Sequence, residues 1–341
     1  MGGRVISDKR ALTVLGPVDR DSLGWVLPHE HLTIDNRVHV EPHDERAVDE
    51  PVGVANLAYV RTWPRALADN IVLDDDESVL ADLRDFAAAG GRSIVEVTPI
   101  AMKRHLERLQ WFARASGVNV IGSTAYYVYR GHKGHVSGRT VADIAEEFVH
   151  DLTAGPIRCG AIGEIGVSAE AFPDELKVLH AALDAQAATG APIFIHVTTV
   201  RPVPSLLDVL QASGRPLDRV VLCHMDYDVR DLAPHRRALS MGLAVELDLF
   251  GYPAWTNANF LHMPTDAQRG EALLQLASEG WSRQLLISHD VCQKMQLTSR
   301  GGFGYAHILR RGVPLLRTLG ASDELLQQMG VETPAHLLCW A

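Results

Sequence analysis

The sequence contains few cysteines for its 341 residues, and they are widely separated. None belongs to a C-x-x-C pair, and together they form no dense framework. A disulfide-stapled fold needs closely spaced cysteines in a short secreted chain. We therefore expect four free thiols, at Cys159, Cys223, Cys292 and Cys339.

Long apolar runs and clusters of basic residues are also absent. The segment KVLHAALDAQAATGAPIFIHV reads as a helix followed by a strand, and polar residues interrupt it too often for a bilayer span. The N-terminal MGGRVISDKRALTV has neither the apolar region nor the cleavage motif of a signal peptide. A net charge of −10 without runs of Lys or Arg argues against a nucleic-acid surface. These absences predict a cytoplasmic protein with no membrane or nucleic-acid partner.

The residues that are present predict a large buried core. Hydrophobic residues make up 47% of the chain and charged residues 22%, as in ordinary globular proteins. From residue 72 onward, short β-branched runs alternate with longer amphipathic segments, which favours a parallel sheet of βα units. Eight such runs are the number that a closed barrel requires. The predicted strands are 24–33, 93–98, 118–125, 159–167, 192–197, 219–225, 244–249 and 284–288.

Helical patterns separate these strands, so we predict one α/β domain over residues 1–341, a (β/α)8 TIM barrel with an extra C-terminal helix at 322–329. Two connections are long, after the first and the eighth strand, and both would emerge at the same rim. The predicted helices are 74–89, 101–116, 141–153, 175–189, 205–212, 230–241, 267–279 and 311–319.

The first predicted strand contains LPHEHLTID, in which two histidines flank a glutamate. Side chains alternate between the two faces of a strand, so His29 and His31 share one face and Glu30 lies on the other. Taken alone, this pattern fits either a metal site or a pair of buried histidines with ordinary hydrogen bonds.

Four more residues of the types that bind metal ions occur at or near the carboxyl ends of other predicted strands. Active sites of such barrels lie at these ends. A lone carboxylate in an apolar run is costly to bury without a positive partner. The four are Glu164 in CGAIGEIGVS, His196 in APIFIHV, His224 in RVVLCHMD and Asp290 in QLLISHD.

Strand alternation predicts which neighbours of these residues point inward. Leu222 would share the inner face with His224, whereas Cys223 and His289 would face the outer helices. For those two we prefer packing, or a hydrogen bond behind the ligands, to a role as ligand. Four histidines and two carboxylates exceed the three protein ligands of a single catalytic zinc. The surplus suggests two metal ions that share a bridging ligand and a hydroxide, and hydrolysis is the chemistry such a pair performs.

The ordered set HEHL, GEIGVS, IHV, CHMD, ELDLFG, ISHD and GGFGYAHIL resembles the phosphotriesterase-related family of the amidohydrolase superfamily. That resemblance implies a binuclear barrel hydrolase, most often with zinc, and a homodimer. It implies that Asp290 accepts the proton of the bridging hydroxide and passes it to the leaving group. It also implies a more buried metal ion on His29, His31 and Asp290, a more exposed one on His196 and His224, and a bridge through Glu164.

Two departures point to one branch of the family. Organophosphate-degrading and lactonase members use a carbamylated lysine as the bridge, where this chain has Glu164, and lactonases have an arginine where it has Leu249. Both departures resemble the mammalian-type branch, which implies hydrolysis of an N-acyl amino sulfonate. We therefore expect cleavage of a small carboxylic amide or ester. Lactone hydrolysis ranks second and phosphotriester hydrolysis third, and a metal-bearing protein that only binds a small ligand is the alternative of another class.

Several residues at the predicted rim could contact a small-molecule substrate. Tyr127 is similar in position to a tyrosine of lactonase relatives, and it is either catalytic or an aromatic wall. Lys294 could pair with an anionic substrate tail or remain solvated. Phe250 and Tyr305 are the other predicted substrate contacts. Cys292 is not expected to be a ligand, and Trp63 and Trp255 either cap an apolar group or only bury the loops.

Overall fold

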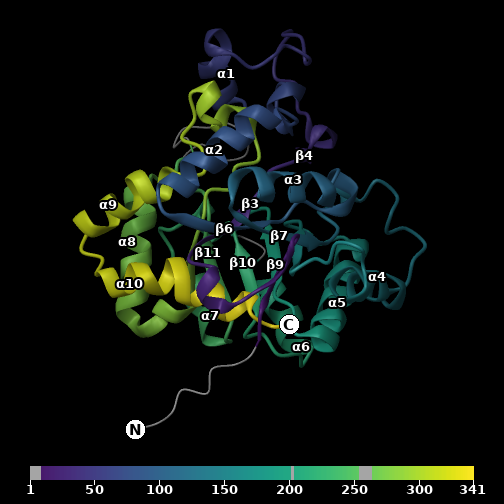
Figure 1. The fold of residues 1–341 in the computed structure, drawn as a ribbon. Helices are drawn as coiled ribbons and strands as arrows, with labels where there is room; N and C mark the ends of the chain where they lie inside the picture. The colour runs from purple at the N-terminus through teal and green to yellow at the C-terminus, as the bar shows by residue number, and fades with distance from the viewer. Residues whose placement is uncertain (1–8, 201–202, 253–262) are drawn as a thin grey trace.

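The structure is a computed structural model, which describes residues 9–200, 203–252 and 263–341. Its centre is one eight-stranded parallel sheet with the strand order β12-β11-β10-β9-β8-β7-β6-β3, surrounded by helices (Figure 1). Each predicted strand overlaps an observed one, so the predicted barrel is confirmed. The strands are β3 (Trp25–Glu30), β6 (Gly91–Glu96), β7 (Asn119–Thr124), β8 (Ala161–Val167), β9 (Ile193–Val197), β10 (Val220–Cys223), β11 (Ala244–Leu247) and β12 (Leu285–Ile287).

The barrel interior is packed, not hollow. One apolar cluster draws at least one residue from each of the eight strands, and it also includes the C-terminal helix α11 (Thr333–Leu338). A closed barrel of this size is filled by such inward side chains. One contribution from each strand is Val26, Val95, Ile121, Ala161, Phe194, Val221, Ala244 and Leu286.

The helices between the strands agree with the predicted ones, apart from their ends. The predicted helix 101–116 is wrong at its start, because a 3₁₀ turn and Lys103, with a left-handed φ of 65°, precede Leu106. The helices are α2 (Asp76–Ala88), α3 (Leu106–Ser116), α4 (Val141–Thr153), α5 (Pro173–Thr189), α6 (Val203–Ala212), α7 (Ala233–Ser240), α8 (Asp266–Leu276) and α9 (Val313–Thr318). Among the described residues, no helix combines the length and apolar character that a bilayer crossing requires.

Extra elements close the amino-terminal end of the barrel. The predicted C-terminal helix is observed as α10 (Asp323–Gln327), and it continues through a π-helical turn into α11. An N-terminal hairpin, β1 (Ala11–Thr13) with β2 (Gly16–Val18), was not predicted. Backbone hydrogen bonds join Arg10 to Ala341 in both directions, at 2.7 and 3.2 Å. The two ends of the described chain therefore seal the same face.

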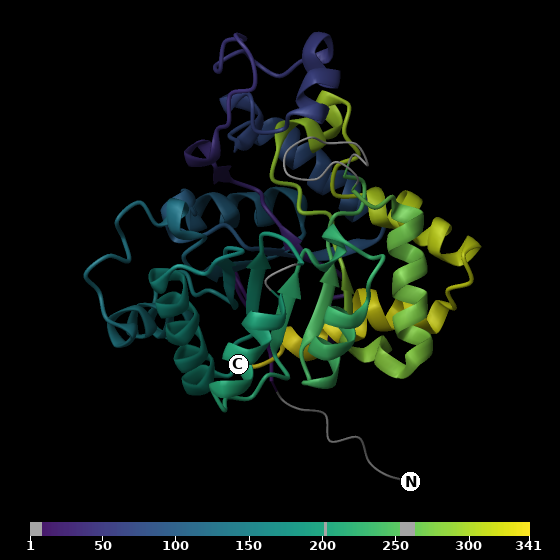
Figure 2. The same ribbon diagram turned by 180° about the vertical axis from the view of Figure 1, so that it is seen from behind.

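The opposite end carries the two long connections, as predicted. Strand arrows point toward this end, where α1 (Leu57–Thr62) and the segment after β12 lie (Figure 2). The two connections touch there, because Val60, Leu67 and Met295 form one apolar cluster with Tyr252 against it. The two ends of the first connection are held together by the short antiparallel pair β4 (Ile34–Asp35) and β5 (Val72–Leu73). Both loops thus form the rim of the mouth.

Candidate metal centre

The carboxylate of Glu164 lies among the four predicted histidine ligands. Strand β8 carries this residue, and its side chain is only 4% exposed. Its Oε2 atom lies 2.9 Å from His196 Nδ1, 3.6 Å from His224 Nε2 and 3.7 Å from His29 Nε2, and its Oε1 atom lies 3.5 Å from His31 Nε2. One carboxylate from one strand thus reaches imidazoles from the ends of three others.

Asp290 completes the group from the end of β12. Its Oδ1 atom lies 3.3 Å from His31 Nε2 and 4.0 Å from His29 Nε2. Its side chain is 14% exposed, more than the other acid of the group, so it lies on the side of the cluster open to solvent. The structure therefore brings together all six residues that the strand ends predicted.

The backbone at two of these strand ends has a left-handed conformation. His224 has a φ of 58° and Asp290 a φ of 51°, values that side chains other than glycine adopt infrequently. Such outliers are concentrated at functional sites, where the surrounding structure enforces them.

The alternation rule fails beside one of these turns. Cys223 belongs to the apolar cluster inside the barrel, whereas Leu222 packs in the cluster that contains the outer helices. The prediction that Leu222 points inward and Cys223 outward is therefore wrong. A left-handed residue breaks the extended geometry on which alternation depends, so His224 joins the interior although its neighbour Cys223 is already there.

The donor set fits metal ions. Both ring nitrogens of His29 and the Oε2 atom of Glu164 are buried, and although charged neighbours lie close to them, none within the described parts of the chain has the geometry of a hydrogen bond. Buried polar groups are nearly always satisfied, so such atoms call for an unseen partner. Three overlapping groups among the described residues have ligand atoms within 4.8 Å of one another, and all three share His29. Two belong to the predicted cluster, one with His31 and Asp290 and one with Glu164 and His224, and the third adds Cys223, Glu246 and Asp248.

The electrostatics agree with that fit. Burial raises the pKa of Glu164, but the positive charges of His196 and the other imidazoles outweigh it and hold that pKa well below its usual range. Burial lowers the pKa of His29, yet Glu246 and Asp248 raise it to about 9. The carboxylates around His29 therefore favour positive charge at that position.

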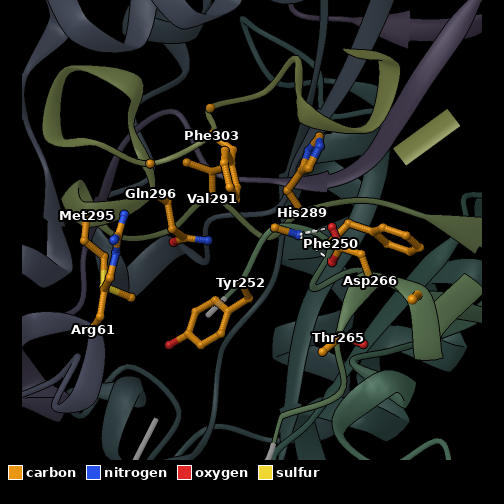
Figure 3. Close-up of a pocket in the computed structure, with 14 residues that line it drawn as sticks. Arg61, Phe250, Tyr252, Thr265, Asp266, His289, Val291, Met295, Gln296 and Phe303 are labelled. Atoms are coloured by element: carbon orange, nitrogen blue, oxygen red, sulfur yellow. Dashed lines mark hydrogen bonds between the residues drawn. The ribbon is translucent and has the colours of Figure 1, made fainter. Parts of the chain in front are cut away.

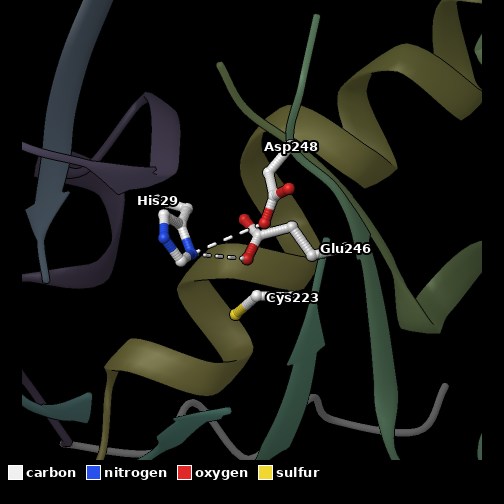
Figure 4. Close-up of side chains that lie close together, drawn as sticks. All are labelled: His29, Cys223, Glu246 and Asp248. Atoms are coloured by element: carbon white, nitrogen blue, oxygen red, sulfur yellow. Dashed lines mark ion pairs between the residues drawn. The ribbon is translucent and has the colours of Figure 1, made fainter. Parts of the chain in front are cut away.

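Two further carboxylates, which the sequence reasoning missed, lie against the ring of His29 (Figure 4). Strand β11 and the residue just beyond it supply Glu246 and Asp248, and each places an oxygen 3.5 Å from His29 Nδ1. Asp248 Oδ1 also lies 2.8 Å from His224 Nδ1. Carboxylates in this position fix the orientation and tautomer of metal-bound imidazoles. The sequence ELDLFG contained a signal for this pair, because Glu246 and Asp248 are two residues apart and such residues share one face of a strand.

Four further predicted rim residues have distinct surroundings. The Tyr127 hydroxyl lies 3.1 Å from His196 Nε2, at the ligand cluster. Tyr305 instead donates to the carbonyl of His31 at 2.7 Å, so it supports the histidine segment. Lys294 is only 9% exposed and pairs with Asp69 at 2.5 Å and Asp74 at 2.8 Å. Trp63 stacks on His43 with ring centroids 3.2 Å apart, and Trp255 lies outside the described residues.

Phe250 lines a cavity of about 490 Å³ beside the ends of β11 and β12 (Figure 3). Tyr252, Met295 and Phe303 form much of its apolar wall. His289 and Val291, which flank Asp290, also contribute to the lining. His289 is not a member of the ligand cluster, because its Nδ1 lies 2.7 Å from Glu30 and its Nε2 accepts from the Ile308 amide.

Fold and site together define an eight-stranded βα barrel whose mouth holds a histidine and carboxylate cluster suited to metal ions. The model of the phosphotriesterase family matches residues 10–338, nearly the whole chain. The chain therefore belongs to the phosphotriesterase family, and the hydrolase class expected from the resemblance is confirmed at that level.

Individual relatives extend this result. An N-acetyltaurine hydrolase from Salmo salar is 34% identical over 96% of this chain and 97% of its own. The structure of a resiniferatoxin-binding protein from Rhodobacter sphaeroides superposes with a TM-score of 0.93 at 33% identity, covering 98% of this chain and 96% of that one. An organophosphorus hydrolase from Deinococcus radiodurans gives a TM-score of 0.75 at 26% identity, over 96% and 97%.

Proposed function

We propose that this protein hydrolyses a small carboxylic amide or ester at a centre of two divalent transition-metal ions, zinc first among them. The observation that carries the proposal is the position of Glu164 between imidazoles from three other strand ends, with Asp290 beside them. His29, His31 and Asp290 would hold one ion and His196 and His224 the other, with Glu164 shared. When bound, such a pair lowers the pKa of a water and polarises the substrate's carbonyl.

The side chains of the cluster supply the remaining chemistry. Asp290 accepts the proton of the attacking water and donates it to the leaving nitrogen or oxygen, a role for which it lies on the open side. Burial raises the pKa of Tyr127 well above its usual range, so its hydroxyl stays protonated and can donate to the oxygen of the scissile carbonyl. Asp248 holds the His224 ring in one orientation throughout. Phe250 and the cavity beside it accept an apolar part of the substrate.

The amide is placed first among substrates because the relative from Salmo salar, similar over the full chain, is named for cleaving one. A lactone or phosphotriester remains the alternative bond, in keeping with the organophosphorus hydrolase likeness. A protein that binds a small ligand without turnover is the rival of another class, suggested by the resiniferatoxin-binding relative. We also propose a cytoplasmic homodimer, which light scattering and cell fractionation would test.

Two measurements test the function. Elemental analysis of the purified protein should give about two transition-metal equivalents per chain, and one or none would contradict the binuclear centre. The metal-reconstituted protein is then screened against N-acyl amino acids, carboxylic esters, lactones and a paraoxon-like triester. A rate on amides or esters far above the other classes supports the proposal. Ligand binding without turnover of any class would favour the binder.

A further inference from the structure

We propose that Arg65 anchors a negatively charged group of the substrate. The substrates would then be small amides or esters that carry a carboxylate or sulfonate. This inference rests on the proposed hydrolase function and specifies which substrates the same site takes.

Arg65 lies in the first long connection, at the rim of the mouth. Leu67, two residues after Arg65, belongs to the same apolar cluster as Met295. Tyr252 packs against this cluster. On the other side, the carbonyl of Arg65 accepts a hydrogen bond from the amide of Glu41 at 2.9 Å. The backbone at this position is therefore held between two segments of the rim, which fixes the origin of the side chain.

Several aromatic groups connect this part of the rim to the metal centre. The His39 ring, two residues before Glu41, meets the Tyr127 ring edge-on with centroids 5.6 Å apart. Tyr127 in turn reaches His196. The charge of Arg65 acts on the side chains of Tyr127, Tyr227 and Tyr252, and it also acts on Cys292. These side chains follow four different strands. Together with the contact between His39 and Tyr127, this places Arg65 on the part of the rim beside Tyr127.

The guanidinium has hydrogen-bonding capacity to spare. Five N–H donors are available on an arginine. Within the described ranges, Glu41 provides its only ion-pair partner, with 3.5 Å between Nη1 and Oε1, and the Glu41 carboxylate is 45% exposed. The Arg65 side chain itself is 33% exposed, so a ligand can reach it. A carboxylate or sulfonate matches the forked donors of arginine better than water does.

Lys294, the cation predicted for this role, is already neutralised. Asp69 and Asp74 both pair with its ammonium group, and the side chain is almost fully buried. A substrate anion would have to displace two carboxylates there. Arg65 is paired only with the half-exposed carboxylate of Glu41 among the described residues, at 3.5 Å, so its charge is less neutralised than that of Lys294.

A fixed cation at the rim would also help an anionic substrate to approach. The chain carries a net charge of −10, which repels an anion at long range, and a guanidinium at the mouth would offset that repulsion locally. Burial lowers the pKa of His39, and the charges of Arg65 and Arg130 lower it further, to about 3, so His39 stays neutral and adds no charge of its own.

The test compares matched substrates on the zinc-loaded protein. N-acetyltaurine and N-acetyl-β-alanine carry a sulfonate and a carboxylate, and N-propylacetamide has a similar length without charge. Arg65→Gln should raise KM for both anionic amides about tenfold or more, with a much smaller change in kcat and in KM for the neutral amide. Arg65→Lys should recover part of the loss. Arg130→Gln is the control, because Arg130 lies 4.0 Å from the same Glu41 but donates to the Val38 carbonyl, and it should keep wild-type kinetics.

The possible failures are distinguishable. If Arg65→Gln affects the anionic and neutral amides equally, or if the wild type prefers the neutral one, the anchor is refuted while the hydrolase function stands. If no amide or ester is cleaved, the proposed function fails. Thermal shifts with N-acetyltaurine then decide the anchor alone: stabilisation of the wild type but not of Arg65→Gln supports it, and equal shifts or none overturn it.

Discussion

The carboxylate of Glu30 accepts a hydrogen bond from the hydroxyl of Ser288 at 2.8 Å and so joins the first and last strands of the barrel. No ladder pairs β3 with β12 in the described sheet, whose order begins at one of these strands and ends at the other. The same carboxylate accepts from the backbone amides of His289 at 3.0 Å and Val291 at 2.9 Å. Glu30 thus helps to close the barrel, together with the hydrogen bonds of Ser288 and Asp290 to the His29 backbone, and it holds both neighbours of Asp290.

Replacing Glu30 with Gln should weaken this closure. The amide nitrogen would face backbone donors that need an acceptor, so we expect a loss of ~1.5–3 kcal/mol in the free energy of unfolding. Activity should fall as well, because the segment that positions Asp290 is loosened. Urea denaturation measures the first effect, with Glu332→Gln, a change at a surface ion pair, as the control expected to cost below ~1 kcal/mol. Equal stability of the two variants would contradict the closing role.

Metal content should depend on Glu164 far more than on Lys294. Glu164→Ala removes the one carboxylate shared by the imidazoles, so the protein should retain about one equivalent or less of the two expected. Lys294→Ala leaves Asp69 and Asp74 unpaired and should lower stability, yet it should keep both ions. Elemental analysis after identical loading compares the variants. Equal metal loss in both would remove Glu164 from its place as the shared ligand.

The ligand cluster could be predicted because its histidines and Asp290 lie at or just beyond strand ends, although Glu164, predicted near the end of its strand, lies in the middle of β8. In a parallel barrel the carboxyl ends converge, so His29, Glu164, His196 and Asp290 were brought to one mouth by order alone. The same reasoning could not assign the inner face at Cys223, because the left-handed turn at His224 is a feature of the backbone that no alternation rule contains.

The rim could not be predicted for a different reason. Lys294 finds its partners in the first connection, more than 200 residues earlier in the chain. Arg65 lies in irregular chain without periodicity, so no pattern distinguished it from other arginines. How many carboxylates pair with each of these cations depends on how the two long connections meet, and only the three-dimensional structure contains that information.

Asp290→Asn should abolish most turnover and keep the fold. Asparagine tolerates the left-handed conformation at this position, and the backbone hydrogen bond from residue 290 to the His29 carbonyl is unaffected. The amide cannot accept the proton of the attacking water, so kcat should fall by about 10²–10⁴. Circular dichroism and steady-state kinetics measure the two properties. An Asn variant that remains active would exclude Asp290 as the base.

Acid should destabilise the protein in part through His235, which is buried in α7 and donates to the Met225 carbonyl at 2.7 Å. Burial lowers the pKa of His235 to about 4, although Asp228 and Asp231 act in the opposite direction. The unfolded chain therefore binds this proton first, near pH 6.5, and stability is lost as the pH falls from there toward 4. By pH 5 the loss from this group is about 2 kcal/mol.

Urea denaturation at pH 7.5 and pH 5 should show His235→Gln losing less stability than the wild type by roughly that amount. The same substitution at the exposed His150 should leave the difference between the two pH values unchanged. Identical pH dependence of wild type and His235→Gln would show that this histidine does not contribute, since loss of metal ions in acid is common to both proteins.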